Sequence, residues 1–260
     1  MNKLTAAILI ITSFLSSYTF AKSEMDYNAQ VMTRSFPVGF FTAGNIGRGF
    51  TLWKTNRLPH GRLNPWYGYI RPSATVQSSG LVNGGRVEVD LMPVSFFGFY
   101  VGKDITYRNI DMGPFNCEAE YCDGRINRTY IGSKFAITVK NFFAMSNFRL
   151  QRTQFDQKGK PFADERATII AQTGRDNLFG GNLALGYKLS DTMAMGTLFI
   201  HNKYQKSGDR SQMKLLFTRI QDESLNYVVG LGTFKSRFDH EILSAIVGIQ
   251  WTGEKGLKLF

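Results

Sequence analysis

Hydrophobic residues alternate with polar or small residues along much of this chain. Val87, Val89 and Leu91, for example, alternate with Arg86, Glu88 and Asp90, and the same period of two recurs as far as Trp251. Neighbouring side chains of a strand point to opposite faces, so each such segment has one apolar face and one polar face. The pattern predicts an all-β protein.

The alternating segments predict ten strands, each long enough to cross a bilayer at a tilt. They lie near residues 66–78, 84–92, 96–108, 127–140, 143–156, 180–190, 192–205, 212–221, 225–237 and 241–252. Segments 37–54 and 166–173 are candidates for two more, which gives the alternative of twelve strands. With both added, we expect the loop that carries the cysteines on the periplasmic side, and ten strands are therefore favoured.

The first 21 residues have the three regions of a secretory signal peptide. Lys3 precedes an apolar stretch, and the segment ends in Thr19-Phe20-Ala21, with small residues at the two positions that signal peptidase reads. Six Ser and Thr residues dilute the stretch, which argues against a permanent helical anchor. We predict a cleaved signal peptide at 1–21, an N-terminal segment at 22–64 that is a plug or holds an extra strand at 37–54, and a barrel at 65–260.

An exported chain with many such strands and no later long apolar run predicts a transmembrane β-barrel. Only helices and closed barrels satisfy every backbone polar group within lipid. Aromatic residues such as Trp66, Tyr107, Phe142 and Trp251 lie near predicted strand ends, where an interfacial girdle would place them. A soluble sandwich also alternates, but many strands here carry charge or glycine on the face that a soluble protein would pack as core.

In this pattern, residues 65–260 resemble the Gram-negative outer-membrane β-barrel proteins. Those proteins typically end in a strand of alternating apolar residues and a final Phe, which the barrel-assembly machinery reads, and this chain ends in Phe260. Phe260 and Trp251 differ in parity, so residues 252–260 contain a bulge or form a tail. The resemblance implies an antiparallel up-and-down barrel in the outer membrane, with lipid, lipopolysaccharide and the assembly machinery as partners.

The net charge of the chain is compatible with nucleic acid as a partner, but the predicted export is not. The chain has 31 basic and 20 acidic residues and a formal net charge of +11, which alone is compatible with nucleic acid. Export makes nucleic acid an unsuitable partner, and a basic exterior beside anionic lipid head groups is the simpler interpretation. The sequence leaves the oligomeric state open.

The predicted inward faces carry more basic than acidic residues. We expect the lumen to be lined by Arg71, Arg86, Glu88, Asp90, Asp104, Arg108, Lys134 and Arg149, with Lys140 and Lys188 near strand ends. If water fills it, such a lumen attracts anions. Because small barrels have little inner space, an interior filled by packed side chains and ion pairs is the alternative.

Both cysteines, Cys117 and Cys122, lie in the predicted loop 109–126. In an oxidising compartment a pair at this spacing is expected to form a disulfide, and no neighbouring His suggests a metal site instead. No pattern calls for a cofactor, a metal or a set of catalytic residues.

The sequence therefore predicts a narrow, anion-favouring channel or a structural surface protein. One alternative is a membrane-embedded hydrolase of lipid or peptide at the outer rim, with His201 or His240 as its base. Another is an adhesin or partner-binding surface built from loops 109–126 and 157–179. An enzyme is the less favoured of these interpretations, because no nucleophile and orienting partner stand at a diagnostic spacing.

Overall fold

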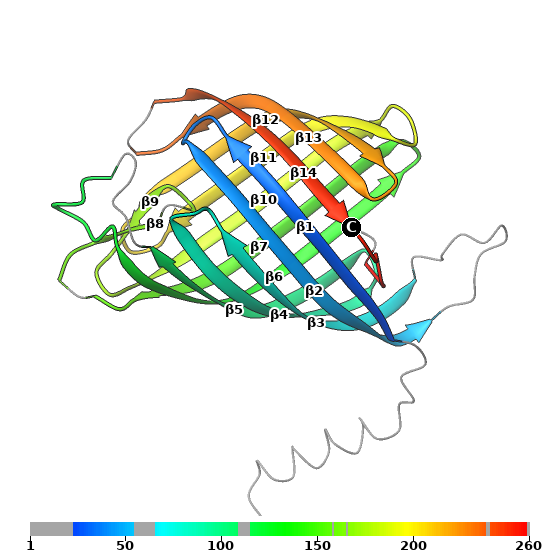
Figure 1. Ribbon diagram of the computed structural model, residues 1–260, viewed down its shortest axis with the longest axis horizontal. Helices are drawn as coiled ribbons and strands as arrows, with labels where there is room; N and C mark the ends of the chain where they lie inside the picture. The colour runs from blue at the N-terminus through cyan, green and yellow to red at the C-terminus, as the bar shows by residue number, and fades with distance from the viewer. Residues whose placement is uncertain are drawn as a thin grey trace, which may run out of the picture.

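Twelve antiparallel strands close into a barrel in this computed structural model (Figure 1). The structure describes residues 23–54, 66–108, 115–157, 159–164, 166–237 and 240–258. The barrel strands are β1 (Ser23–Arg34), β2 (Gly39–Lys54), β3 (Tyr67–Ser78), β4 (Val82–Val94), β5 (Phe97–Arg108), β6 (Gly124–Val139), β7 (Phe142–Phe155), β10 (Arg175–Lys188), β11 (Met193–Tyr204), β12 (Arg210–Asp222), β13 (Leu225–Lys235) and β14 (Ile242–Thr252). The all-β closed barrel is therefore confirmed.

The strand count is twelve, the alternative, and the two added strands are both at the N-terminal end. β1 and β2 come from the segment predicted as a plug or a single extra strand, so the barrel begins at Ser23 and not at residue 65. β1 pairs with β14 and with β2, which closes the ring. The other candidate, 166–173, holds only the short strand β9 (Ile169–Ala171), which pairs with β8 (Phe162–Asp164) outside the barrel sheet.

This arrangement also corrects the expected position of the cysteine loop. Two strands added before residue 65 leave every later connection on its predicted side. The start of β1 and the end of β14 lie at one end of the barrel, called here the terminal end, where Asn28 pairs with Thr252. The connections that hold the cysteines and β8–β9 lie at the opposite end, called here the loop end (Figure 1).

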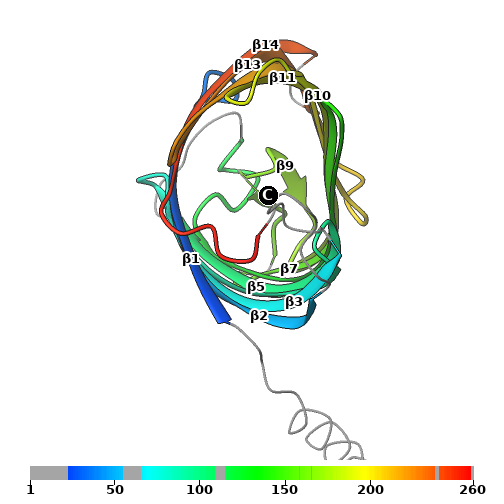
Figure 2. The same ribbon diagram turned by 90° about the vertical axis from the view of Figure 1, so that its right-hand side faces the viewer.

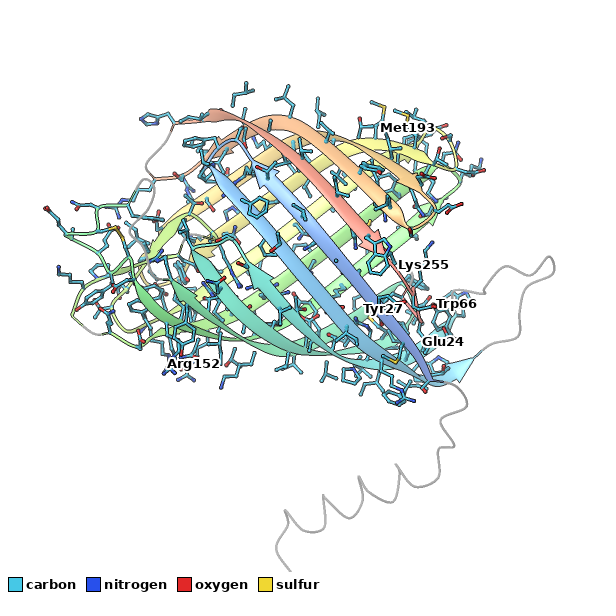
Figure 3. The ribbon with its side chains drawn as sticks, viewed as in Figure 1. Glu24, Tyr27, Trp66, Arg152, Met193 and Lys255 are labelled. Carbon is cyan, nitrogen blue, oxygen red and sulfur yellow. A yellow bond between two sulfur atoms is a disulfide. The ribbon has the colours of Figure 1, made fainter. Side chains whose placement is uncertain are left out.

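The outer surface of the barrel is apolar and exposed. Outward-facing side chains include Val76, Val101, Ile131, Leu216 and Leu243, each with more than half of its surface exposed. Exposed aromatic residues cluster at the terminal end, among them Trp53, Trp66 and Phe142. An apolar outer band edged by aromatic residues is the surface that a barrel presents to lipid (Figure 3).

Two predictions fall on residues outside the described ranges. These are the signal peptide at 1–21 and the role of the final Phe260. The last strand ends at Thr252, and residues 253–258 leave it as a tail, the second of the two expectations for this segment. No helix in the described part of the chain is long and apolar enough to span a membrane.

A plugged lumen as the candidate functional site

The lumen has a polar wall and an apolar wall. Inward-facing charged side chains gather on β1, β3, β4, β5 and β6. The inward faces of β11 to β14 are mostly apolar and pack together as one cluster, formed by Met213, Leu215, Phe234, Ile246, Leu198, Ile200 and Val228. A packed apolar wall does not line a water-filled pore, so any solute path must follow the polar wall.

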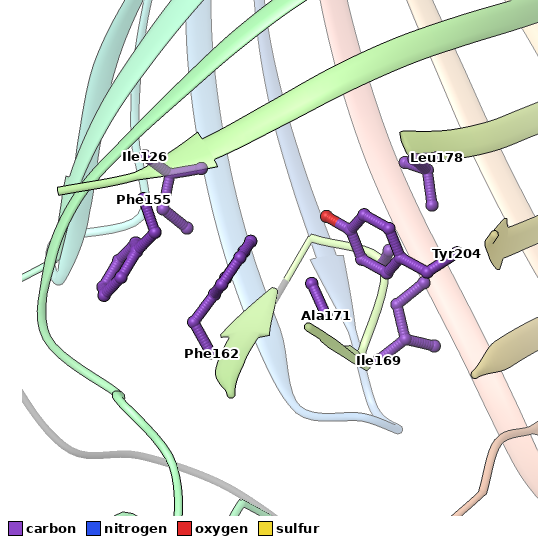
Figure 4. Packing of buried hydrophobic residues seen from close by; sticks show 8 residues of the cluster. Ile126, Phe155, Phe162, Ile169, Ala171, Leu178 and Tyr204 are labelled. Carbon is purple, nitrogen blue, oxygen red and sulfur yellow. The ribbon is translucent and has the colours of Figure 1, made fainter. Parts of the chain in front are cut away.

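The β8–β9 hairpin turns into the lumen at the loop end. In the view along the barrel, β9 lies inside the ring of strands (Figure 2). Phe162, Ile169 and Ala171 are fully buried. They pack against inward-facing side chains of the wall, among them Ile126, Phe155, Leu178 and Tyr204 (Figure 4). Burial of this apolar surface holds the hairpin in place as a plug.

Charged side chains also anchor the hairpin to the wall. Asp164 of β8 accepts a hydrogen bond from Arg128 at 2.9 Å and another from the Tyr204 hydroxyl at 2.7 Å. Arg166 reaches Asp104 at 2.9 Å. These carboxylates and Arg128 are almost completely buried. In a buried ion pair, loss of either partner leaves an uncompensated buried charge.

The electrostatics of the hairpin favour its charged form at neutral pH. Burial alone would raise the pKa of Asp164, but Arg128, the Tyr204 hydroxyl and Arg166 outweigh burial and hold this pKa below its usual range. Burial, with the neighbouring Arg128, lowers the pKa of Arg166 to about 10. Both groups are therefore ionised at neutral pH, and their pairs with the wall are intact.

The predicted disulfide joins Cys117 and Cys122 and lies against the hairpin. Cys122 packs with Ala163 and Ile170 in one buried cluster. The backbone of Tyr121 pairs with this region too, since its N–H donates to Pro161 O at 2.9 Å and its C=O accepts from the Ala163 N–H at 3.1 Å. The disulfide loop thus clamps the plug from its outer side.

A chain of ion pairs runs along the polar wall from the terminal end. Lys258 of the tail lies 2.6 Å from Asp26. Asp26 accepts two hydrogen bonds from Arg71, at 2.7 and 2.6 Å. Asp90 then joins Arg71, at 3.2 Å, to Lys134, at 2.6 Å. Gly47 leaves the space for the Arg71 side chain, because a Cβ at this position would overlap the guanidinium.

The same chain of charges continues to the plug. Lys134 also donates to Glu88 at 2.6 Å. Arg86, which faces the same wall, lies 3.5 Å from Asp104. Asp104 in turn contacts Arg128 at 3.2 Å and, in the hairpin, Arg166. Basic and acidic side chains therefore alternate along the wall between the tail and the hairpin.

The tail covers part of the terminal end. Leu257 packs in a buried cluster with Tyr67, Tyr69 and Met92, and its C=O accepts a hydrogen bond from the Tyr67 hydroxyl at 2.8 Å. Burial, reinforced by Arg71, lowers the pKa of the Lys258 ammonium, while Asp26 opposes this shift. Figure 2 shows the tail crossing the inside of the ring at this end.

A cavity of about 340 Å³ lies along the polar wall, with Lys258 of the tail among its lining residues. Its charged lining comes from Arg71, Arg86, Glu88, Asp90, Lys134 and Lys258, and its neutral polar lining includes Asn45, Ser73, Asn147 and Asn182. This volume admits a small molecule, within the size range of ordinary ligand pockets.

The structure places the eight predicted lumen residues on inward positions. Five of them line the cavity or its ion pairs: Arg71, Arg86, Glu88, Asp90 and Lys134. Asp104 lies under the hairpin, and Arg108 is buried near the disulfide loop, where it donates to Tyr121 O at 3.2 Å. The Arg149 guanidinium lies over the Tyr130 ring, 4.6 Å from its centroid.

The alternation pattern did not indicate five charged residues of the site: Asp26, Arg128, Asp164, Arg166 and Lys258. Asp26 and Arg128 lie on strands with clear alternation, and Arg128 shares the inward parity of Lys134. Recognition of β1 as a strand would have identified Asp26. Extension of the inward parity of Lys134 to the start of β6 would have identified Arg128. Asp164 and Arg166 belong to a connection, where no period indicates direction.

His201 and His240 are the two candidate bases for a hydrolase. His201 faces outward on β11, and its Nδ1 lies 3.3 Å from the Gln212 amide nitrogen. Asp239, the carboxylate next to His240, falls outside the described ranges. Within those ranges, no group of three or more His, Cys, Asp or Glu side chains is arranged to hold a metal ion.

Known proteins that this chain is similar to come from the solved structures. No protein-family model and no curated protein sequence matches the chain. Among solved structures, the KdgM porin matches at 11% identity and a TM-score of 0.45, over 87% of this chain and 98% of that one. The NanC porin matches at 10% identity and a TM-score of 0.45, over 86% and 98%. The translocator domain of the autotransporter NalP from Neisseria meningitidis matches at 12% and 0.40, over 95% and 96%.

This chain has the fold of a Gram-negative outer-membrane β-barrel protein. Its own strand pairing, apolar exterior and charged interior establish this. At TM-scores below 0.5, the likenesses identify no closer relative. Apart from the connection between β2 and β3, those at the terminal end are short, and the connections between β5 and β6 and between β7 and β10, which are the two longest, lie at the loop end, as on the periplasmic and outer sides of such barrels.

Proposed function

We propose that this protein is a narrow, normally closed outer-membrane channel for small, preferentially anionic solutes. The polar cavity is the middle of the solute path, and the β8–β9 hairpin is the plug at its outer mouth. Export through a cleaved signal peptide at 1–21 is part of the proposal, and N-terminal sequencing of the mature protein tests it.

One observation supports the anion preference more than any other, namely which charges remain accessible. The cations Arg86, Lys134 and Lys258 each expose about a quarter of the side chain, at 25%, 23% and 24%. Their carboxylate partners are more deeply buried, with Glu88 at 11% and Asp90 at 7%. Although acids and bases nearly balance along the wall, a solute in the cavity meets mainly positive groups. Fixed charge of this sign favours anions.

The closed state follows from the buried hairpin. Residues 162–164 and 169–171 fill the loop end and are held by apolar packing, ion pairs and the disulfide loop. The second predicted loop, 157–179, thus turns inward over much of its described length, which leaves less of it available for an adhesive surface. Assembly by the barrel-assembly machinery stays a prediction.

Single-channel recording in planar bilayers tests this function. The wild-type protein is compared with a variant in which residues 159–173 are replaced by a short Gly-Ser linker, and with the full-length variant Asp164→Asn/Arg166→Gln. We expect rare, small currents for the wild type and frequent anion-preferring currents for both variants. Variants that fold, as judged by heat-modifiable migration on gels, and stay as silent as the wild type would identify a structural barrel instead.

A further inference from the structure

The outer wall of the barrel carries a one-sided basic surface near the loop end. On β5, β6, β7, β10, β11 and β12, the outward, exposed positions in the half toward this end include Lys103, Arg125, Arg152, Arg175, Lys203, Arg210 and Lys214. The acidic residues of these strands in the same half, Asp104 and Asp176, are buried and face inward. The corresponding half of β1 to β4 has no outward basic residue among its described positions between Gln30 and Phe41 or between Ser73 and Val87.

The strand register brings three of these charges close together. Lys103 pairs with Thr129, Thr129 with Arg152, and Arg152 with Asn177. Lys103 and Arg152 are therefore two strand spacings apart, roughly 10 Å, and Arg175 is diagonal to Arg152. Like charges on one sheet face repel each other. No carboxylate of the described residues forms an ion pair with Lys103, Arg152 or Arg175, so this surface lacks an anion from the chain itself.

On β7, the first basic outward position marks the outer edge of the apolar band. The outward positions of this strand from Phe142 to Leu150 are apolar or small, and the next outward position toward the loop end is the first charged one.

 
That first charged residue is Arg152, which lies on the outer wall near the loop end (Figure 3). The apolar stretch covers roughly 27 Å of strand, or about 20 Å across the membrane at the usual strand tilt. Arg152 therefore lies where lipid tails give way to head groups, and Lys103 lies two strands away from it.

We propose that this basic surface binds the phosphate groups of the glycolipid in the outer leaflet. The argument is charge complementarity at a fixed depth: cations without a protein partner lie beside the layer in which phosphorylated glycolipid presents its anions. Arg donates two parallel hydrogen bonds to a phosphate, and Lys adds a point charge. This inference rests on the membrane-embedded barrel and is independent of whether the lumen conducts.

Native mass spectrometry of the full protein in detergent tests the proposal. The probe is bis-phosphorylated lipid A, compared with lipid A from which both phosphates have been removed. The test variant is Lys103→Gln/Arg152→Gln. The control is Lys140→Asn/Lys188→Gln, which removes two exposed basic residues at the terminal end. Heat-modifiable migration shows that each variant contains a folded barrel.

We expect the wild type and the control to retain phosphorylated lipid A, and the test variant to lose at least tenfold in affinity. Equal retention by the test variant and the wild type would overturn the proposal. So would equal retention of the phosphate-free lipid by the wild type, which would show that the acyl chains alone are recognised. A test variant that changes only the ratio of monomer to dimer would assign the surface to a second copy of this chain, and would also overturn the proposal.

Discussion

Arg128 and Asp164 form an ion pair of 2.9 Å that joins the wall of the barrel to the hairpin inside it. Arg128 comes from β6 and Asp164 from β8, 36 residues later. Both side chains are almost completely buried, and the Tyr204 hydroxyl completes the hydrogen bonding of the carboxylate. Closure of the lumen therefore depends on specific residues, namely this ion pair and its neighbours.

Asp164→Asn should loosen the hairpin without unfolding the barrel. The substitution leaves the buried Arg128 guanidinium without its charged partner in the hairpin, which costs about 3 kcal/mol in such pairs. Hydrogen exchange at the Ile170 amide, which donates to Asp209 at 2.7 Å, should become faster by about two orders of magnitude. Asp123→Asn, which changes an exposed carboxylate nearby, is the control and should leave this exchange unchanged. Unaltered protection in Asp164→Asn would show that apolar packing alone holds the plug.

Acid should open the plug only at low pH. The folded-state pKa of Asp164 is depressed, so its contribution to stability is fully present above the pKa of an unfolded Asp, about 4. It is lost as pH falls further, through the depressed folded value. Protection of the Ile170 amide should thus stay constant from pH 7 to about pH 4 and fall below that. An opening centred between pH 5 and 7, or one that persists in Asp164→Asn, would contradict this assignment.

Removal of the disulfide should weaken the outer clamp on the hairpin. In the chain-entropy account, closing so short a loop contributes about 2 kcal/mol. Cys122 also packs directly on Ala163 and Ile170. We expect Cys117→Ser/Cys122→Ser to increase protease cleavage within residues 159–171 while the barrel stays heat-modifiable. Intact-mass measurement of the wild type should show no free thiol, and two free thiols would refute the pairing.

Charge in the cavity should set ion preference once the plug is removed. In the variant with residues 159–173 replaced, Lys134→Met should shift the chloride-to-potassium permeability ratio toward potassium by about fivefold, since a unit charge a few ångströms from the path is worth about 1 kcal/mol in water. Glu88→Gln removes the opposite charge and should shift the ratio toward chloride. Reversal potentials in a salt gradient measure both, and shifts in the same direction would rule out this path.

The barrel was predictable because lipid imposes a period of two on every strand. The inward parity of Arg71, Glu88, Asp90 and Lys134 was read directly from that period. β2 was recognised only as a candidate, because Gly44, Gly47 and Gly49 weaken its alternation. Two of these glycines are explained by tertiary packing, since the side chains of Arg71 and Leu257 fill the space above Gly47 and Gly49.

The plug was not predictable from local sequence. Phe162, Ile169 and Ala171 belong to a connection, and a short apolar segment in a connection fits an outer loop as well as an inserted hairpin. What places them is the complementary wall of Ile126, Phe155 and Tyr204, which β6, β7 and β11 supply together. The pairing of charges was hidden for the same reason, because Asp26 and Arg71 are 45 residues apart and meet only when β1, β2 and β3 lie side by side.

The most direct test of the plugged lumen is chemical access to the cavity from outside the cell. Ser73→Cys places a thiol in the cavity lining, and the native cysteines are paired with each other. A membrane-impermeant thiol reagent added to intact cells should leave Ser73→Cys unmodified while the hairpin is present, and should modify it once residues 159–173 are replaced by the linker. Rapid modification with the hairpin in place would contradict the closed lumen.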